Sequence, residues 1–136
     1  MDFRFSLEAM SLSFVSIPGL KVCVENVMLV PGLETPSDKP FAFVYFLTID
    51  NGSEQTVTVK GRKWIVTEEN GESVVVEGPG VVGETPTLSP GGNFSYNSCH
   101  VIATTAEAKG SLFGVTESGE FFRVEIPDFK MTPPNS

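Results

Sequence analysis

Residues 62–77 read RKWIVTEENGESVVVE, and this stretch decides the fold class. Asn70-Gly71 separates two strand-like segments, and Asn-Gly in such a position is the strongest short-range signal for a β-hairpin. Period-two alternation recurs along the chain from residue 22 onward, and no segment shows the 3.6-residue periodicity of an amphipathic helix. The sequence therefore predicts an all-β protein.

Turns rich in glycine and proline divide the chain into short segments of strand character. We expect strands at 22–30, 41–50, 56–59, 62–68, 73–77, 93–103, 111–117 and 121–126. Lys60-Gly61 separates two of them, and a glycine at such a point indicates a bulge or bend. About seven short antiparallel strands predict a β-sandwich of immunoglobulin or fibronectin type III style, with a small barrel as the alternative. We expect an N-terminal extension (1–20), one domain (21–131) and a short tail (132–136).

Composition narrows the function classes. The 136 residues suffice for one core, and 9 basic against 17 acidic residues give a formal net charge of −8. Such a charge opposes direct nucleic-acid binding and anionic membranes. The longest apolar run, FAFVYFL at 41–47, is too short to span a bilayer. Without a recognisable signal peptide, we expect a soluble cytoplasmic protein in which Cys23 and Cys99 are free thiols.

The segment 41–50 is apolar on both faces. Alternate residues from Phe41 to Ile49 form one face, which we expect to point into the core. Ala42, Val44 and Phe46 form the opposite face, and something must cover it. One candidate cover is the N-terminal extension, through Phe3, Phe5, Leu7, Leu12 and Phe14, together with neighbouring side chains of the same sheet. The other is a second protein chain, which includes a second copy in a homodimer.

Residues 78–83 read GPGVVG and fit the G-x-G-x-x-G pattern of nucleotide-binding proteins. That fingerprint depends on a following helix, but residues 84–92 contain too many prolines and glycines for one. Two alternatives remain. Gly78, Gly80 and Gly83 could form a cradle of amides for a small anion, helped by Arg62 or Lys63. Otherwise the glycines make a tight connector between strands, with Val81 and Val82 as its anchors.

Residues for catalysis or metal binding are scarce. His100 is the single histidine, and it follows Cys99 directly in a strand. Adjacent strand residues point to opposite faces, so the two cannot form a nucleophile–base pair or share one metal ion. We expect Cys99 to face inward and His100 outward. No catalytic residue, metal site or cofactor is predicted, and the chain is not expected to be an enzyme.

Two further features of the hairpin have structural interpretations. We expect Trp64 to be a core residue, because a large aromatic side chain in a strand usually packs inside. Glu68, Glu69 and Glu72 flank the Asn70 turn, and we expect them to form a solvated hairpin tip.

Several motifs together resemble the bacterial ApaG family over about residues 22–131. They are R-x-W-I-x-T (62–67), Asn70-Gly71, G-x-GVVGE-x-P (78–86), L-x-PG (88–91), F-x-Y-x-S (94–98), and Gly119 with EFFRVEIPDF (120–129). The chain departs from the family pattern at Lys63, where an aromatic residue or His is usual, at Cys99, where Gly is usual, and at 105–108.

The resemblance implies a fibronectin type III-like sandwich. Bacterial members are small cytoplasmic proteins that genetics connects to cobalt tolerance and magnesium efflux. Related domains occur in a eukaryotic F-box protein and in a DNA-polymerase-delta-interacting protein, which implies a non-enzymatic protein–protein interaction module. The family's glycine loop has been considered a pyrophosphate site, which would fall on Gly78, Gly80 and Gly83 here.

Overall fold

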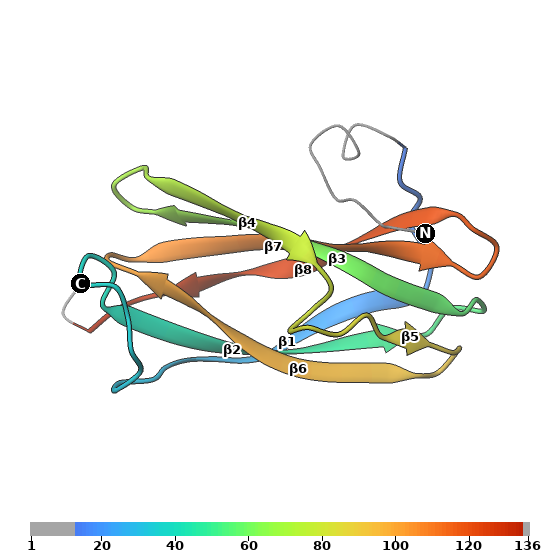
Figure 1. The fold of residues 1–136 in the computed structure, drawn as a ribbon, viewed down its shortest axis with the longest axis horizontal. Coiled ribbons are helices and arrows are strands. Elements are labelled where there is room, and N and C mark those ends of the chain that lie inside the picture. The colour runs from blue at the N-terminus through green and yellow to red at the C-terminus, as the bar shows by residue number, and fades with distance from the viewer. Residues whose placement is uncertain (1–12, 135–136) are drawn as a thin grey trace.

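The computed structural model describes residues 13–134, which form two packed antiparallel sheets without a helix (Figure 1). One sheet has the strand order β1-β2-β6, and the other has the order β4-β3-β7-β8 with the short β5 also paired to β3. The strands are β1 (Leu20–Leu29), β2 (Phe41–Asn51), β3 (Val57–Glu68), β4 (Ser73–Pro79), β5 (Thr87–Leu88), β6 (Asn93–Ile102), β7 (Ala106–Thr116) and β8 (Phe121–Met131). The predicted β-sandwich is confirmed. Within the described residues no helix could cross a membrane.

The short strand β5 was not expected, and three other strands differ most from expectation. Segments 56–59 and 62–68 are one continuous strand, β3, and the glycine signal marks a bulge between Val59 and Gly61. Strand β7 begins at Ala106, five positions before the predicted start of 111. Strand β8 continues through Pro127, because the register of β7 with β8 shifts between Ala108 and Gly110 at this point. A proline at such an irregularity removes no regular ladder hydrogen bond.

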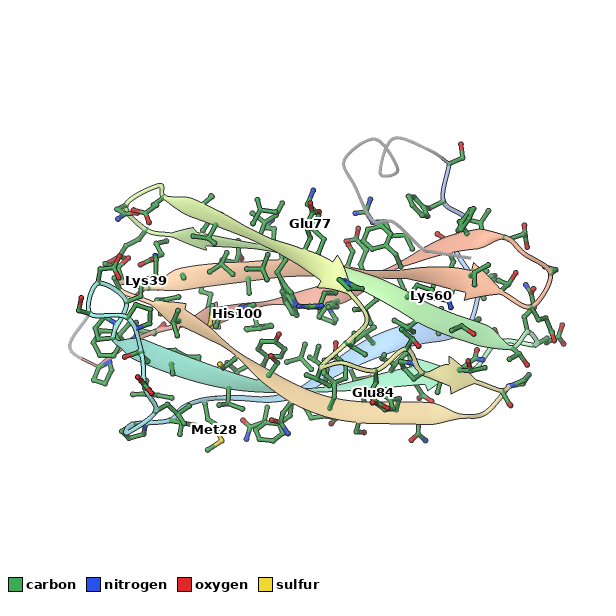
Figure 2. All side chains as sticks on the ribbon, in the orientation of Figure 1. Met28, Lys39, Lys60, Glu77, Glu84 and His100 are labelled. Atoms are coloured by element: carbon green, nitrogen blue, oxygen red, sulfur yellow. The ribbon has the colours of Figure 1, made fainter. Side chains whose placement is uncertain are left out.

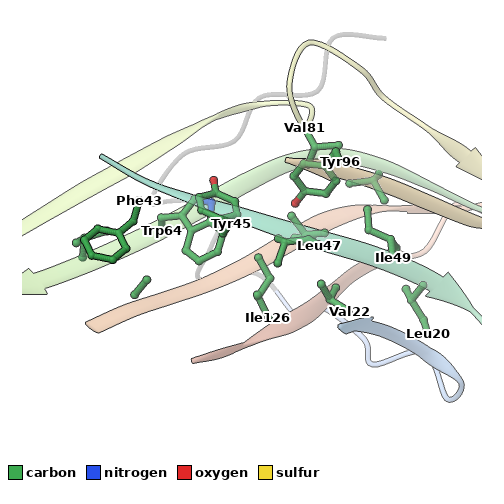
Figure 3. Packing of buried hydrophobic residues seen from close by; sticks show 14 of the residues in the cluster. Leu20, Val22, Phe43, Tyr45, Leu47, Ile49, Trp64, Val81, Tyr96 and Ile126 are labelled. Carbon is green, nitrogen blue, oxygen red and sulfur yellow. The ribbon is translucent and has the colours of Figure 1, made fainter. Parts of the chain in front are cut away.

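The core lies between the sheets, as the alternation predicts. Phe43, Tyr45, Leu47 and Ile49 point inward from β2, and they meet Trp64 and Ile126 from the opposite sheet (Figure 3). Phe122 of β8 belongs to the same core. Trp64 is almost fully buried, which confirms its predicted role. Gly110 leaves room for the indole, because a Cβ at position 110 would come within 2.6 Å of the Trp64 ring.

The described part of the N-terminal extension covers the outer face of the sheet that contains β7 and β8. The Phe14 and Phe113 rings pack edge to face with centroids 5.1 Å apart. Phe113 faces outward, because its neighbour Leu112 belongs to the core. The backbone of Val15 donates to the carbonyl of Phe121 at 2.9 Å and accepts from the amide of Arg123 at 3.1 Å.

The prediction that Phe14 covers the outer face of 41–50 is therefore wrong, because Phe14 packs on the other sheet. Phe3, Phe5, Leu7 and Leu12 lie outside the described residues. Ala42 is only 2% exposed, so it offers no surface to a partner, whereas Val44 and Phe46 are half-buried.

Candidate interaction site between the open edges of the sandwich

The two sides of the sandwich are closed differently. Strands β1 and β8 pack against each other along one side. The remaining edge strands are β4 and β6, and a cleft of about 210 Å³ lies between them. It is lined by Lys39, Tyr45, Arg62, Trp64, Val66, Glu68, Val74, Val76, Ser98, Cys99, His100 and Val101.

Aromatic rings form the floor of this cleft. The His100 imidazole lies 4.7 Å from the Tyr45 ring and 4.7 Å from the Trp64 indole, measured between centroids. Tyr45 and Trp64 are 5.0 Å apart, and Phe129 of β8 packs against all three rings. Burial raises the pKa of the Tyr45 hydroxyl, which a hydrogen bond with Ser98 partly opposes. The rigid floor therefore places one titratable imidazole at the base of an open cleft.

The predicted orientation of Cys99 and His100 is wrong. His100 is 7% exposed and points between the two layers (Figure 2), whereas Cys99 is exposed. The reason is the phase of β6, because Tyr96 and Ile102 face the core and His100 lies an even number of residues from both. Cysteine is usually buried, which is why the sequence suggested that Cys99 faces inward. The sequence signal for the observed arrangement is that Tyr96 and Ile102, on the same side of β6 as His100, are large residues suited to the core.

The Nε2 atom of His100 is buried and has no hydrogen-bond partner among the described residues. Burial lowers the pKa of the imidazole to about 4, so the ring is neutral at pH 7. A buried ring nitrogen without a partner is costly, because it has lost its hydration. Within residues 13–134, the hydrogen-bonding capacity of His100 Nε2 is therefore unused.

Glu68 closes one end of the cleft. Its Oε2 accepts a 2.5 Å hydrogen bond from Lys39 Nζ, and its Oε1 accepts from the amides of Ala103 and Thr104 at 3.0 and 2.7 Å and from the Thr104 hydroxyl at 3.0 Å. Burial alone would raise the pKa of this carboxyl. The hydrogen bonds outweigh burial and lower the pKa to about 2.

The Glu68 side chain is 3% exposed, so its prediction as part of a solvated hairpin tip is wrong, while Glu69 and Glu72 are exposed as expected. Glu68 continues the inward phase of Trp64 and Val66, which places it under the loop that follows β6. The ion pair also raises the pKa of Lys39 through its hydrogen bond to Glu68. Lys39 and Glu68 thus neutralise each other at this end.

Arg62 extends from the cleft toward the glycine loop. Its Nη1 donates to the carbonyls of Pro79 at 2.9 Å and Gly80 at 3.2 Å. The guanidinium passes over Gly78, where a Cβ would lie 3.2 Å from Nη1. No carboxylate among the described residues forms an ion pair with Arg62.

The glycine loop is a tight turn. The amides of Val81 and Glu84 each donate to the other's carbonyl, at 2.8 and 2.9 Å, and Val82 and Gly83 between them have φ angles of +44° and +81°. Two central residues with positive φ define a type I′ turn. Gly80 also has positive φ, and a Cβ there would lie 2.5 Å from the Glu84 carbonyl oxygen.

This turn accounts for the glycines without a ligand. Val81 is fully buried and anchors the turn in the core (Figure 3), as predicted, whereas the predicted second anchor Val82 is 47% exposed. The amides of Gly80, Val81 and Glu84 bond within the protein, and Pro79 has no N–H. In residues 79–84 this leaves only the amides of Val82 and Gly83 as free donors, a shorter row than a cradle built on Gly78, Gly80 and Gly83 would use.

The cationic residues predicted to help bind phosphate are not brought together. Arg62 lies on the cleft side of β3, whereas Lys63 lines a separate depression on the outer face with Ile65, Ser111 and Arg123. Phosphate binding by Gly78, Gly80 and Gly83 stays a prediction that this geometry does not favour.

Among the strands that the structure describes, β4 has one edge without a neighbour, beside the cleft. Val74, Val75 and Val76 are 40%, 54% and 37% exposed, which is unusual for three consecutive valines. The ladder to β3 is bonded at both ends, from the Glu68 amide to the Glu72 carbonyl and from the Gly80 amide to the Lys60 carbonyl.

Backbone bonds in an antiparallel pair alternate along each strand. Residues 74, 76 and 78 therefore turn their amides and carbonyls toward β3, in phase with residues 72 and 80. Ser73, Val75 and Glu77 turn theirs away from the sheet. Pro79, which has no N–H, ends this row of open donors. Sequence reasoning found the strand but missed its exposure, because three consecutive valines predict a buried strand equally well.

Comparison with known proteins assigns the chain to a family. The model of the ApaG domain family matches residues 31–115, more than half of the chain. The chain belongs to the ApaG family. Protein ApaG of Acidithiobacillus ferrooxidans is 40% identical over 113 residues, covering 82% of this chain and 88% of that protein. Protein ApaG of Vibrio cholerae is 35% identical over 122 residues, covering 89% of this chain and 96% of that protein.

A solved structure shares the fold. The crystal structure of a Bordetella pertussis protein described as ApaA matches with a TM-score of 0.77 at 31% identity, covering 91% of this chain and 100% of that chain. The predicted resemblance is confirmed. In this ApaG-family chain, the residues that carried the resemblance have packing roles: Trp64 fills the core, Gly78 makes room for Arg62, and Gly80 and Gly83 shape the turn.

Cys23 and Cys99 are free thiols, as predicted. Among residues 13–134, no three His, Cys, Asp or Glu side chains gather in a group that could hold a metal ion.

Proposed function

We propose that this ApaG-family chain is a non-enzymatic protein-interaction module that binds an extended segment of a partner along β4. The open edge of β4 is the observation that carries the proposal. Ser73, Val75 and Glu77 offer backbone donors and acceptors on the side away from β3. An added strand would satisfy these groups, and exposed Val74 and Val76 would supply apolar contact.

A foreign partner is favoured over a second copy. Each copy carries a formal charge of −8, so association of two copies is opposed by repulsion. Two exposed acidic residues accompany the β4 edge: Glu72 directly precedes the strand, and Glu77 lies within it (Figure 2). A partner segment with Lys or Arg near these positions would complement them.

Non-enzymatic action fits the placement of the reactive groups. His100 is buried and neutral at pH 7, and the exposed thiol of Cys99 lies on the opposite face of β6. No base is therefore positioned to activate this nucleophile. In this proposal, the bound partner, and not this chain itself, would produce the effects on cobalt tolerance and magnesium efflux that the family resemblance implies.

The experiment is a selection of displayed 12-residue random peptides on the full chain and on Val75→Pro. Proline removes the outward N–H of residue 75 and no bond of the β3–β4 ladder. Val75→Thr is the matched control, because it keeps the N–H and the β-branched shape. We expect peptides that alternate apolar and polar residues, that bind wild type and Val75→Thr, and that bind Val75→Pro at least tenfold more weakly. Selected peptides that bind Val75→Pro equally well would refute β4 as the docking edge. A dimer of the free chain that Val75→Pro dissociates would keep β4 as the docking edge and would refute the foreign partner in favour of a second copy.

A further inference from the structure

The cleft between β4 and β6 carries one positive charge that the described residues do not neutralise. Its charged side chains are Lys39, Arg62 and Glu68. Lys39 pairs with buried Glu68 and also with Glu72, an exposed residue outside the cleft lining. Within residues 13–134, Arg62 has hydrogen bonds only to the backbone carbonyls of Pro79 and Gly80. A guanidinium has five N–H donors, so this contact leaves donors available. In a chain of net charge −8, an uncompensated cation in a partly buried cleft is a specific feature.

The same cleft holds a second unused group. His100 Nε2 is buried without a partner, in a side chain that is 7% exposed. Tyr45, Trp64 and Phe129 hold the imidazole in place through ring contacts, so its orientation is fixed before a ligand arrives. Preorganised recognition groups lose little conformational entropy on binding.

We propose that this cleft binds a carboxylate group, with Arg62 supplying the compensating charge and His100 Nε2–H donating a hydrogen bond. One uncompensated positive charge matches a monoanion. A phosphate carries almost twice the charge of a carboxylate. The cleft would offer it the single cation Arg62, between apolar walls formed by Val74, Val76 and Trp64, so a phosphate would be poorly compensated there. The volume of about 210 Å³ suits the end of a side chain.

This inference rests on the proposed function for the source of the carboxylate. Val74 and Val76 line the cleft, while Ser73, Val75 and Glu77 have the opposite phase and face away from it. A strand docked on β4 would alternate in the same way. Its residues on the cleft side would reach Arg62 and His100, so an Asp or Glu at such a position is the group recognised. Free small carboxylates share the chemistry and form a separate arm of the test.

The chain offers a clean reporter, because His100 is its only histidine. The titratable and charged residues that line the cleft with it are Lys39, Tyr45, Arg62, Glu68 and Cys99, and the thiol of Cys99 points to the opposite face of β6. A carboxylate bound beside the imidazole would stabilise its protonated form. Its pKa, about 4 in the free chain, should then rise by one unit or more.

The experiment follows the His100 ring signals by NMR between pH 3.5 and 7 in the full chain. The probes are the capped peptide KVTEKV, its counterpart KVTQKV, and the blocked amino acids N-acetylglutamate amide and N-acetylglutamine amide. We expect both Glu probes to raise the pKa of His100 and both Gln probes to leave it unchanged. Arg62→Gln should abolish the effect, whereas Lys63→Gln, on the opposite face of β3, should retain it. Arg62→Lys is included because it keeps the positive charge. The melting temperature of each variant shows whether a lost response reflects lost binding or lost folding.

The outcomes distinguish this inference from the proposed function. If Glu and Gln probes act alike, or if a folded Arg62→Gln responds like wild type, carboxylate recognition is refuted even when the peptides dock. If Val75→Pro responds equally to the peptide and the blocked amino acid, strand docking fails while the carboxylate site stands. A Glu effect seen only with the peptide assigns the carboxylate to a docked partner.

Discussion

The imidazole of His100 stands edge-on to the indole of Trp64, with ring centroids 4.7 Å apart and planes inclined at 77°. The two residues come from opposite sheets, β6 and β3, so their contact links the layers directly. They are also the only histidine and the only tryptophan of the chain. Ring NMR signals and indole fluorescence therefore report on the floor of the cleft without interference from other residues.

His100 should make the fold sensitive to mild acid. The folded pKa, about 4, lies below the ordinary value of 6.5, so the unfolded chain binds the proton first as pH falls. Stability should therefore fall from pH 6.5 toward pH 4, by about 3 kcal/mol over the whole window. In urea unfolding between pH 5 and 6.5, His100→Phe should have a flatter profile than wild type. Equal slopes for the two proteins would contradict the burial of a neutral imidazole.

Glu68→Gln should destabilise the protein at pH 7 by about 2 kcal/mol, because it weakens charge-assisted hydrogen bonds in a buried position. Glu69→Gln is the matched control, because Glu69 is the adjacent carboxylate and is exposed. The folded pKa of Glu68 lies below its ordinary value, so its contribution is present above pH 4.5 and is lost as pH falls toward 2. Denaturant melts at pH 7 and pH 3 test both statements, and equal effects of the two substitutions would refute the role of Glu68.

Val82→Asn should stabilise the protein by about 1 kcal/mol. Val82 has a φ of +44°, which is unfavourable for a β-branched residue, and the substitution creates the Asn-Gly pair that type I′ turns prefer. The side chain is exposed, so little burial is lost. Gly83→Ala, at φ +81° with open space around the new Cβ, isolates backbone strain and should destabilise. A drop in melting temperature for Val82→Asn would contradict the turn assignment.

Phe14→Ala should lower stability by about 1–2 kcal/mol, because it removes the ring that packs on Phe113. Ser13→Ala, at the exposed neighbouring position, should change it little. Thermal denaturation of both variants provides the measurement. Identical melting temperatures for Phe14→Ala and wild type would show that this contact contributes no stability.

The fold was predictable because its signals are local. The Asn70-Gly71 turn, the alternation of β2 and the inward face of β8 each depend on a few neighbouring residues. The type I′ turn at 81–84 was harder to assign, because the same glycines satisfy a nucleotide-binding pattern and only the missing helix argues against it.

The site was less predictable because it depends on contacts between distant segments. Lys39, Glu68 and Thr104 meet only after three loops come together at one end of the sandwich. Whether His100 faces inward depends on the phase of one strand. The exposure of β4 depends on strand order, which leaves β4 and β6 as unpaired edges in different sheets. None of these relationships is encoded in a short motif.

Amide hydrogen exchange along β4 tests the central claim most directly. Free chain should exchange quickly at Ser73, Val75 and Glu77, whose amides point away from β3, and slowly at Val74 and Val76, which bond to β3. Adding a selected peptide should slow exchange at the first three amides by at least tenfold and leave the other two little changed. Protection that appears elsewhere, with these three amides still exchanging quickly, would contradict strand docking on β4.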